Sequence, residues 1–101
     1  MCQLFAGQDP TRYSSTTRRL RLNGQSTSIR LENAFWDILD QIAEADGVST
    51  PAFISRLHSE VLETRGEPTN FTSLLRTACL VFAGQSSATA HQGDSLALAA
   101  E

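Results

Sequence analysis

The chain has 101 residues, of which 41% are hydrophobic, so its length allows one domain with a small core. No apolar run approaches the length of a membrane-spanning helix, and Met1–Leu4 has neither the basic start nor the long apolar stretch of a secretory signal. We therefore expect a soluble, cytoplasmic protein with no membrane partner.

The cysteines and histidines do not form a metal or redox motif. Cys2 and Cys79 stand at opposite ends of the chain, and His58 and His91 have no ligand spacing. The sequence therefore predicts no disulfide, no metal site and no cofactor, with Cys79 as a small buried side chain.

The carboxylates are also arranged unlike a catalytic site. Asp37, Asp40 and Glu44 fall on the exposed face of a predicted helix, and no histidine or cysteine accompanies them. The glycines are isolated turn formers rather than a phosphate-binding loop. The sequence therefore predicts that the protein is not an enzyme.

Charge is distributed unevenly along the chain. The net charge is −3, yet residues 1–31 carry five arginines against Asp9 alone, whereas residues 32–101 carry three arginines against ten acids. There is no lysine. The planar fork of arginine donates two parallel hydrogen bonds to phosphate, guanine or carboxylate. The basic N-terminal third suits nucleic acid, and a merely solvated arginine-rich surface is the alternative.

Residues 1–16 are expected to form an N-terminal arm, because Gly7–Pro10 is a turn signal and a Ser/Thr cluster follows. Residues 17–31 then alternate with the period of a β-strand. The apolar set on one face is Leu20, Leu22, Thr27, Ile29 and Leu31, and the polar set on the other is Arg19, Arg21, Ser26, Ser28 and Arg30.

Asn23–Gly24 divides this stretch and offers a turn that tolerates positive φ. We prefer a four-residue loop, 23–26, which sets Leu20 opposite Ile29 and keeps one apolar and one polar face. A two-residue loop would instead set Arg18 opposite Ile29. A single long strand without a hairpin is the remaining alternative. In the hairpin, the outer face carries Arg19, Arg21 and Arg30.

Two amphipathic helices follow, separated by a G-V-S turn. The first is expected to begin near Asn33, which caps it, and to end at Gly47. The second begins after its cap Ser49, tolerates Pro51 in its first turn and ends at Gly66. The predicted core faces are Phe35, Ile38, Leu39, Ile42 and Ala43 on the first helix and Phe53, Ile54, Leu57, Val61 and Leu62 on the second.

Trp36 lies off this apolar stripe, where it would close a dimer contact or cover the edge of the core. A third helix is predicted from about Asn70 to Gly84, with a buried face made of Phe71, Leu74, Leu75, Ala78 and Phe82. The predicted organisation is an arm at 1–16, a strand-helix-helix module at 17–66, the third helix within 67–84 and a disordered tail at 85–101.

Three segments carry a family resemblance: M-C-Q-L-F-A-G-Q-D-P near the start, R-L-R-L-N-G-Q-S-T-S-I-R-L-E-N-A-F-W, and N-F-T-S-L-L-R after the second helix. With them the chain resembles the ribbon-helix-helix family, and within it an uncharacterised bacterial branch, over roughly residues 1–83. The resemblance implies a mainly α fold with a β-ribbon. It further implies a ribbon-helix-helix dimer that has an N-terminal arm and an additional C-terminal helix.

In that family, strands of two chains pair antiparallel and lie in the major groove of DNA, where alternate side chains read bases. The resemblance implies base contacts from Ser26, Ser28 and Arg30. The start of the second helix, at Ser49 and Thr50, would hold a phosphate, as free amides and the helix dipole favour. Arg19 and Arg21 would hold further phosphates, and the expected dimer interface comprises Thr27, Ile29, Leu31 and Trp36.

The chain departs from the family pattern in three respects. The segment with Leu20 and Leu22 would widen the ribbon, and Pro51 removes one amide from the phosphate-holding turn. The acidic body also weakens the electrostatic part of DNA affinity.

The expected function is that of a homodimeric DNA-binding transcriptional regulator. The alternative is a protein-binding regulator that masks or sequesters a transcription factor or other protein, using the acidic body, the third helix and exposed Trp36 and Phe82. For Arg30 itself, the alternative role is an ion pair with Glu32 or with an acid of the partner chain. Salt dependence separates the two functions, because phosphate binding weakens steeply as salt rises.

Overall fold

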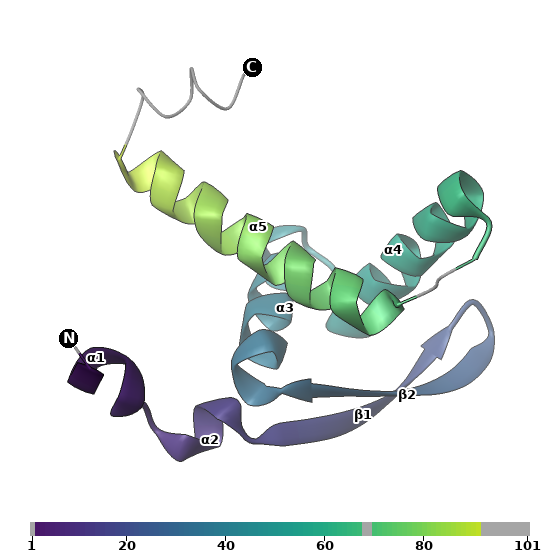
Figure 1. The fold of residues 1–101 in the computed structure, drawn as a ribbon. Coiled ribbons are helices and arrows are strands. Elements are labelled where there is room, and N and C mark those ends of the chain that lie inside the picture. Colours follow the sequence, from purple (N-terminus) through teal and green to yellow (C-terminus); the bar gives the residue numbers. More distant parts are fainter. Residues whose placement is uncertain (1, 68–69, 92–101) are drawn as a thin grey trace.

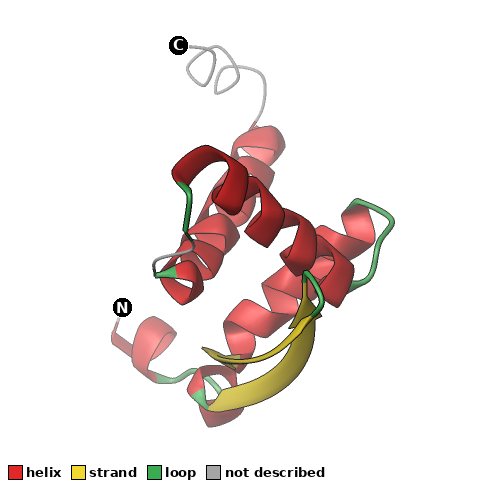
Figure 2. Cartoon of the chain, turned by 90° about the vertical axis from the view of Figure 1, so that its right-hand side faces the viewer, coloured by secondary structure: helices red, strands yellow, loops and turns green. Residues whose placement is uncertain are grey.

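A computed structural model describes residues 2–67 and 70–91, in which three long helices lie on one face of a two-stranded β-hairpin (Figures 1 and 2). The mainly α fold with a β-ribbon and an additional C-terminal helix is confirmed. Within the described ranges, no helix combines the length and apolar character needed to cross a membrane. The elements are α1 (Cys2–Ala6), α2 (Pro10–Tyr13), β1 (Ser15–Leu22), β2 (Gln25–Glu32), α3 (Asn33–Ala45), α4 (Thr50–Arg65) and α5 (Phe71–His91).

The hairpin closes through a two-residue turn rather than the predicted four-residue loop. Asn23 has φ 52° and Gly24 has φ 87°, and the register sets Leu22 opposite Gln25 and Arg18 opposite Ile29. The preference for a loop over 23–26 is therefore wrong. Asn-Gly takes positive φ at both central positions, which matches the twist of the flanking strands. This register turns Arg18 toward the helices, which would be unfavourable for an unpaired charge. In the structure, Arg18 has partners on that side.

The two faces of the hairpin nevertheless hold the predicted residues. Leu20, Leu22, Ile29 and Leu31 are buried beneath the helices, and Thr27 is half-buried. The polar residues of the other face are exposed, because a change of two residues in loop length leaves the side-chain alternation intact. The hairpin thus has an apolar inner face and a polar outer face.

Asn33 does not cap α3. The N-cap is Glu32, which makes no side-chain capping bond, and Asn33 is the first helical residue. The Asn33 side chain donates to the Thr11 carbonyl at 2.7 Å and accepts from the Thr16 hydroxyl. Its backbone N–H donates to the Ser14 carbonyl at 2.8 Å. The Asn33 side chain therefore connects the N-terminal arm to the body instead of capping α3.

The buried face of α3 keeps Leu39 and Ala43 of the predicted stripe but is shifted to include Trp36. Trp36, Leu39 and Ala43 are buried, whereas Phe35, Ile38 and Ile42 are half-buried. Trp36 is only 2% exposed within its own chain, so the expectation of an exposed anchor or dimer contact there is wrong. The reason is that β1 lies over this side of the helix, where the Thr16 carbonyl accepts from the Trp36 indole N–H at 2.8 Å.

The end signals at the C-terminus of α3 and at both ends of α4 act as predicted. Gly47, just beyond α3, has φ 74°, and Gly66 follows α4 with φ 89°. The Ser49 hydroxyl accepts from the Ala52 N–H at 3.2 Å, which confirms it as the cap of α4. Ile54 is the fully buried residue of this helix, and the predicted core residue Leu62 is instead 38% exposed.

Helix α5 packs against α3 and β2 through Leu75 and Cys79, both fully buried. Phe82 is half-buried, and Leu80 and Val81 are exposed. The helix continues to His91, so the prediction that it stops at Gly84 is wrong. One glycine inside a helix lowers the stability of the helix by only about 1 kcal/mol relative to alanine, so a single glycine does not have to end the helix. The remainder of the predicted tail, 92–101, lies outside the described residues.

Candidate nucleic-acid interface

The outer face of the hairpin brings together all the strand residues predicted to contact DNA. Across the two strands, Arg19 lies opposite Ser28, Arg21 opposite Ser26, and Thr17 opposite Arg30. Arg30 is thus the diagonal neighbour of Arg19 on the same face. The four-residue loop, which sets Leu20 opposite Ile29, would also have set Arg19 opposite Arg30; in the observed register each of Arg19 and Arg21 faces a serine instead, which separates the charges.

Two of these arginines make no hydrogen bond or ion pair within the part of the chain that the structure describes. Arg21 donates to the Gly24 carbonyl at 3.1 Å, whereas Arg19 and Arg30 form no hydrogen bond or ion pair with any described residue. Glu32 is not the ion-pair partner of Arg30, because it accepts from Arg76 Nε at 3.2 Å. A hydrogen bond from its own backbone amide, and then that from Arg76, lower the pKa of Glu32.

The N-terminus of α4 offers two free backbone donors within the described residues, the amides of Ser49 and Thr50. Ala52 N–H is capped by the Ser49 hydroxyl, Phe53 N–H donates to the Ser49 carbonyl at 2.9 Å, and Pro51 has no N–H. The Thr50 hydroxyl donates to Asp40 Oδ1 at 2.6 Å. The amides of Ser49 and Thr50 have no acceptor among the described residues. The predicted phosphate contact at Ser49 and Thr50 therefore has these two amides and the Ser49 hydroxyl hydrogen as its available donors.

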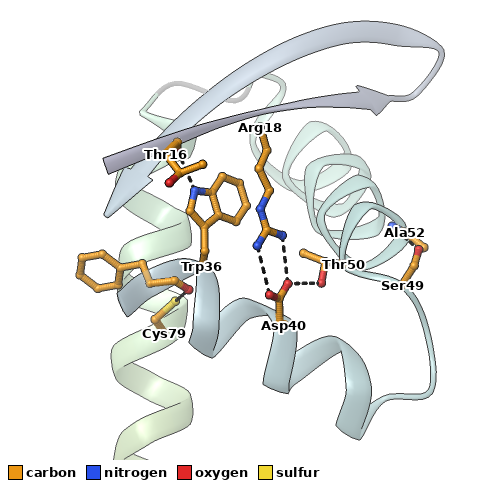
Figure 3. Close-up of polar contacts among 9 residues, drawn as sticks. Thr16, Arg18, Trp36, Asp40, Ser49, Thr50, Ala52 and Cys79 are labelled. Carbon is orange, nitrogen blue, oxygen red and sulfur yellow. Dashed lines mark hydrogen bonds and ion pairs between the residues drawn. The ribbon is translucent and has the colours of Figure 1, made fainter. Parts of the chain in front are cut away.

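Asp40 links this helix start to the hairpin (Figure 3). Arg18 reaches from the inner face of β1 and donates to Asp40 from both terminal nitrogens, Nη1 to Oδ1 at 3.0 Å and Nη2 to Oδ2 at 3.1 Å. Its guanidinium carbon lies 4.3 Å from the Trp36 ring centroid. Sequence reasoning placed Asp40 on a solvated face and gave Arg18 no role. The register of the two-residue turn was the signal that could have turned Arg18 toward the helices.

The tip of the hairpin is fastened to α4 as well. The Asn23 side-chain nitrogen lies 2.8 Å from His58 Nδ1, and the Ser59 hydroxyl donates to Asn23 Oδ1 at 2.7 Å. Asn23 N–H also donates to the Ser55 hydroxyl at 3.3 Å. The hairpin is therefore held against the helices at its tip, through Asn23, and within β1, through Arg18.

The Asp40 contacts predict a dependence of stability on pH. Hydrogen bonds from Arg18, and secondarily from Thr50, lower the pKa of Asp40 below 3.8. A depressed folded-state pKa stabilises the protein above the unfolded-state value, and this contribution is lost as the pH falls through the folded-state value. Wild type should exceed Asp40→Asn in free energy of unfolding at pH 7, and the difference should shrink below pH 3.8. Urea titrations across this range measure it; a difference that stays constant would contradict an ionised Asp40.

Comparison with known proteins matches residues 15–82 to the family model described as the ribbon-helix-helix domain. Among solved structures, the chain is similar to an uncharacterized protein from Bordetella pertussis Tohama I, with 41% sequence identity and a TM-score of 0.85. The match covers 94% of this chain and 76% of that one. A search of curated proteins found no match.

Proposed function

The chain belongs to the ribbon-helix-helix domain family, and on that premise we propose that it is a homodimeric transcriptional regulator that places an antiparallel β-ribbon in the major groove of DNA. Family members are commonly DNA-binding regulators, and the fold is typically non-enzymatic. The observation that carries the proposal is the outer face of the hairpin. Arg19 and Arg30 are exposed there and make no hydrogen bond or ion pair with the described residues. We propose that the protein acts in the cytoplasm.

The backbone of β2 supplies the second half of the proposal. In a two-residue hairpin turn, the closing residues Leu22 and Gln25 form a hydrogen-bonded pair. Pairs alternate in an antiparallel ladder, so the backbone groups of Ser26, Ser28 and Arg30 point to the edge that β1 leaves open. An open edge of this kind pairs readily with another strand. Antiparallel pairing of residues 27–31 with the same residues of a second chain satisfies these groups and doubles the arginine face.

The proposed contacts follow from this arrangement. Arg30 donates two hydrogen bonds to guanine, and Ser26 and Ser28 make shorter base or phosphate contacts. Arg19 and Arg21 neutralise phosphates, and the Thr50 amide with Ser49 holds a further phosphate at the dipole-favoured start of α4. Ile29 and Leu31 fill the core of their own chain below the shared ribbon, and Thr27 is half-buried on the same face.

Arginine substitutions test these roles. Arg30→Ala should weaken binding to the preferred site by about 1–3 kcal/mol relative to random DNA, the usual value of a bidentate base contact. Arg19→Ala should weaken all sequences alike and flatten the slope of log affinity against log salt by about one unit. Fluorescence anisotropy with a duplex selected by the wild-type protein, and with random duplex, measures both effects.

Arg65→Ala is the matched control, because it removes the same charge from the last turn of α4, away from the hairpin. It should leave the discrimination between selected and random duplex unchanged. Equal losses on both duplexes for Arg30→Ala would make Arg30 a phosphate contact, and an unchanged affinity would remove it from the interface.

Protein binding is a second candidate function, but the residues that support it are not the predicted Trp36 and Phe82. Trp36 is buried and offers no anchor, but Leu80 and Val81 on α5 are 65% and 55% exposed. Large exposed apolar side chains suit a protein interface. Pull-downs from lysate with and without nuclease separate the candidates. A partner that survives nuclease and is lost in Leu80→Ser, but not in Arg30→Ala, would favour protein binding.

A further inference from the structure

We propose that Asp40 is a positioning residue for DNA binding, which fixes the N-terminus of α4 and its free Thr50 amide relative to the arginine face of the hairpin. The inference rests on the proposed function. It concerns a residue that contacts the inner side of the hairpin, through Arg18, and not its outer arginine-bearing face.

One carboxylate joins three elements. Asp40, on α3, accepts from both terminal nitrogens of Arg18 on β1, at 3.0 and 3.1 Å. Its Oδ1 also accepts from the Thr50 hydroxyl, at 2.6 Å, at the first residue of α4. A two-point arginine-carboxylate contact fixes the plane of both groups as well as their separation. The added hydroxyl then sets where α4 begins with respect to that plane.

Arg18 is itself held in place. Its guanidinium lies over the buried Trp36 ring, and the indole N–H of that residue donates to the Thr16 carbonyl on the same strand as Arg18. Figure 3 shows this sequence of contacts running from the hairpin through Trp36 and Arg18 to Asp40 and Thr50. Arg18 thus points to the helices, unlike its neighbours Arg19 and Arg21, which face outward.

The contact is better suited to fixing geometry than to stabilising the fold. The Arg18 and Asp40 side chains are 36% and 45% exposed, and an ion pair this accessible contributes little to stability. The start of α4, however, carries its free amides, those of Ser49 and Thr50, directly beside this contact, so both move together if the helix shifts. Phosphate contacts set the register and orientation of a protein on the duplex. A displaced Thr50 amide would therefore also misplace Arg30 over its base.

Three variants and a matched control test the inference by binding to a duplex selected by the wild-type protein. Thr50→Val removes the hydroxyl at constant shape, and Asp40→Asn removes the charge. Each should lower affinity by about tenfold. Thr50→Ser restores a hydroxyl and should recover most of the loss. Asp46→Asn removes the 2.6 Å ion pair with Arg56, which also bridges to α4 but touches neither the hairpin nor Thr50, and should bind as wild type.

A measurement without DNA distinguishes positioning from general loosening. Residual dipolar couplings of backbone amides report the orientation of α4 relative to the hairpin. They should fit one rigid arrangement in wild type and Asp46→Asn, and should show a reoriented α4 in Thr50→Val and Asp40→Asn. Reduced affinity with an unchanged orientation would overturn the positioning role.

The two proposals fail in different ways. If wild type binds the duplex and both Thr50→Val and Asp40→Asn bind equally well, Asp40 has no positioning role and the proposed function stands. If wild type retains no duplex from a random library at low salt, the proposed function is wrong and the positioning role is wrong with it.

Discussion

Ser28→Pro is expected to dissociate the protein into single chains and abolish DNA binding. The Ser28 N–H points to the open edge of β2, where the partner strand would accept from it, and proline has no N–H to donate. Within one chain the change is tolerable, because proline is accepted on an edge strand whose N–H faces solvent. Sedimentation velocity measures the mass, and circular dichroism measures the fold that remains.

Two matched substitutions separate dimerisation from folding. Ser28→Ala keeps the amide and should remain dimeric. Ile29→Pro removes an N–H that faces β1, so it should break the hairpin itself and unfold the chain. A Ser28→Pro protein that sediments as a stable dimer would place the dimer interface away from β2. A wild-type protein that is a folded monomer would refute the dimer altogether.

Strand faces could be predicted from sequence even where the turn could not. Side chains alternate with a period of two, so loops of two and four residues leave Arg19, Arg21 and Arg30 on the same face. The loop itself was mispredicted because Arg18 had no visible partner. Its partners, Asp40 and Trp36, lie on a helix about twenty residues further along, and no local pattern relates them.

Three helix-end signals were predicted correctly, at Gly47, Ser49 and Gly66, whereas the cap at Asn33 and the end at Gly84 were wrong, and helix faces were predicted only in part. Ser49, Gly47 and Gly66 act through their own backbone geometry and hydrogen bonds, which sequence displays directly. The face of a helix that becomes buried depends on where its neighbours lie. On α3 the hairpin covers Trp36 and α5 lies beside Phe35, so the buried face is rotated from the stripe that periodicity indicates.

The net charge of the protein is acidic although the outer face of the hairpin is basic, because the two signs lie in different parts of the chain. Arg18, Arg56 and Arg76 are each paired with an acid, and the remaining excess of acids lies in residues 32–101. The outer hairpin face keeps Arg19, Arg21 and Arg30, and Glu32 at its end is occupied by Arg76. DNA responds to the local field of a surface within about 10 Å rather than to the total charge of the protein.

Leu39→Ala and Ile54→Ala are each expected to lower the free energy of unfolding by about 2–5 kcal/mol, as large-to-small core changes do. Both side chains are fully buried in one cluster with Leu31 of the hairpin and Leu75 of α5. Truncation removes apolar contacts and leaves a cavity that a closely packed interior fills only in part. Urea unfolding measures the loss, with protomer concentration held constant because dissociation is coupled to unfolding in a dimer.

Leu62→Ala is the internal control for this prediction. It is the same truncation on the same helix as Ile54, but its side chain is 38% exposed. The cost should be clearly smaller, since a side chain that already meets solvent loses less on truncation. An equally large loss at Leu62 would mean that a partner chain covers this face of α4. A change of less than about 0.5 kcal/mol at both Leu39 and Ile54 would instead place the core elsewhere, because that is the range of ordinary surface substitutions.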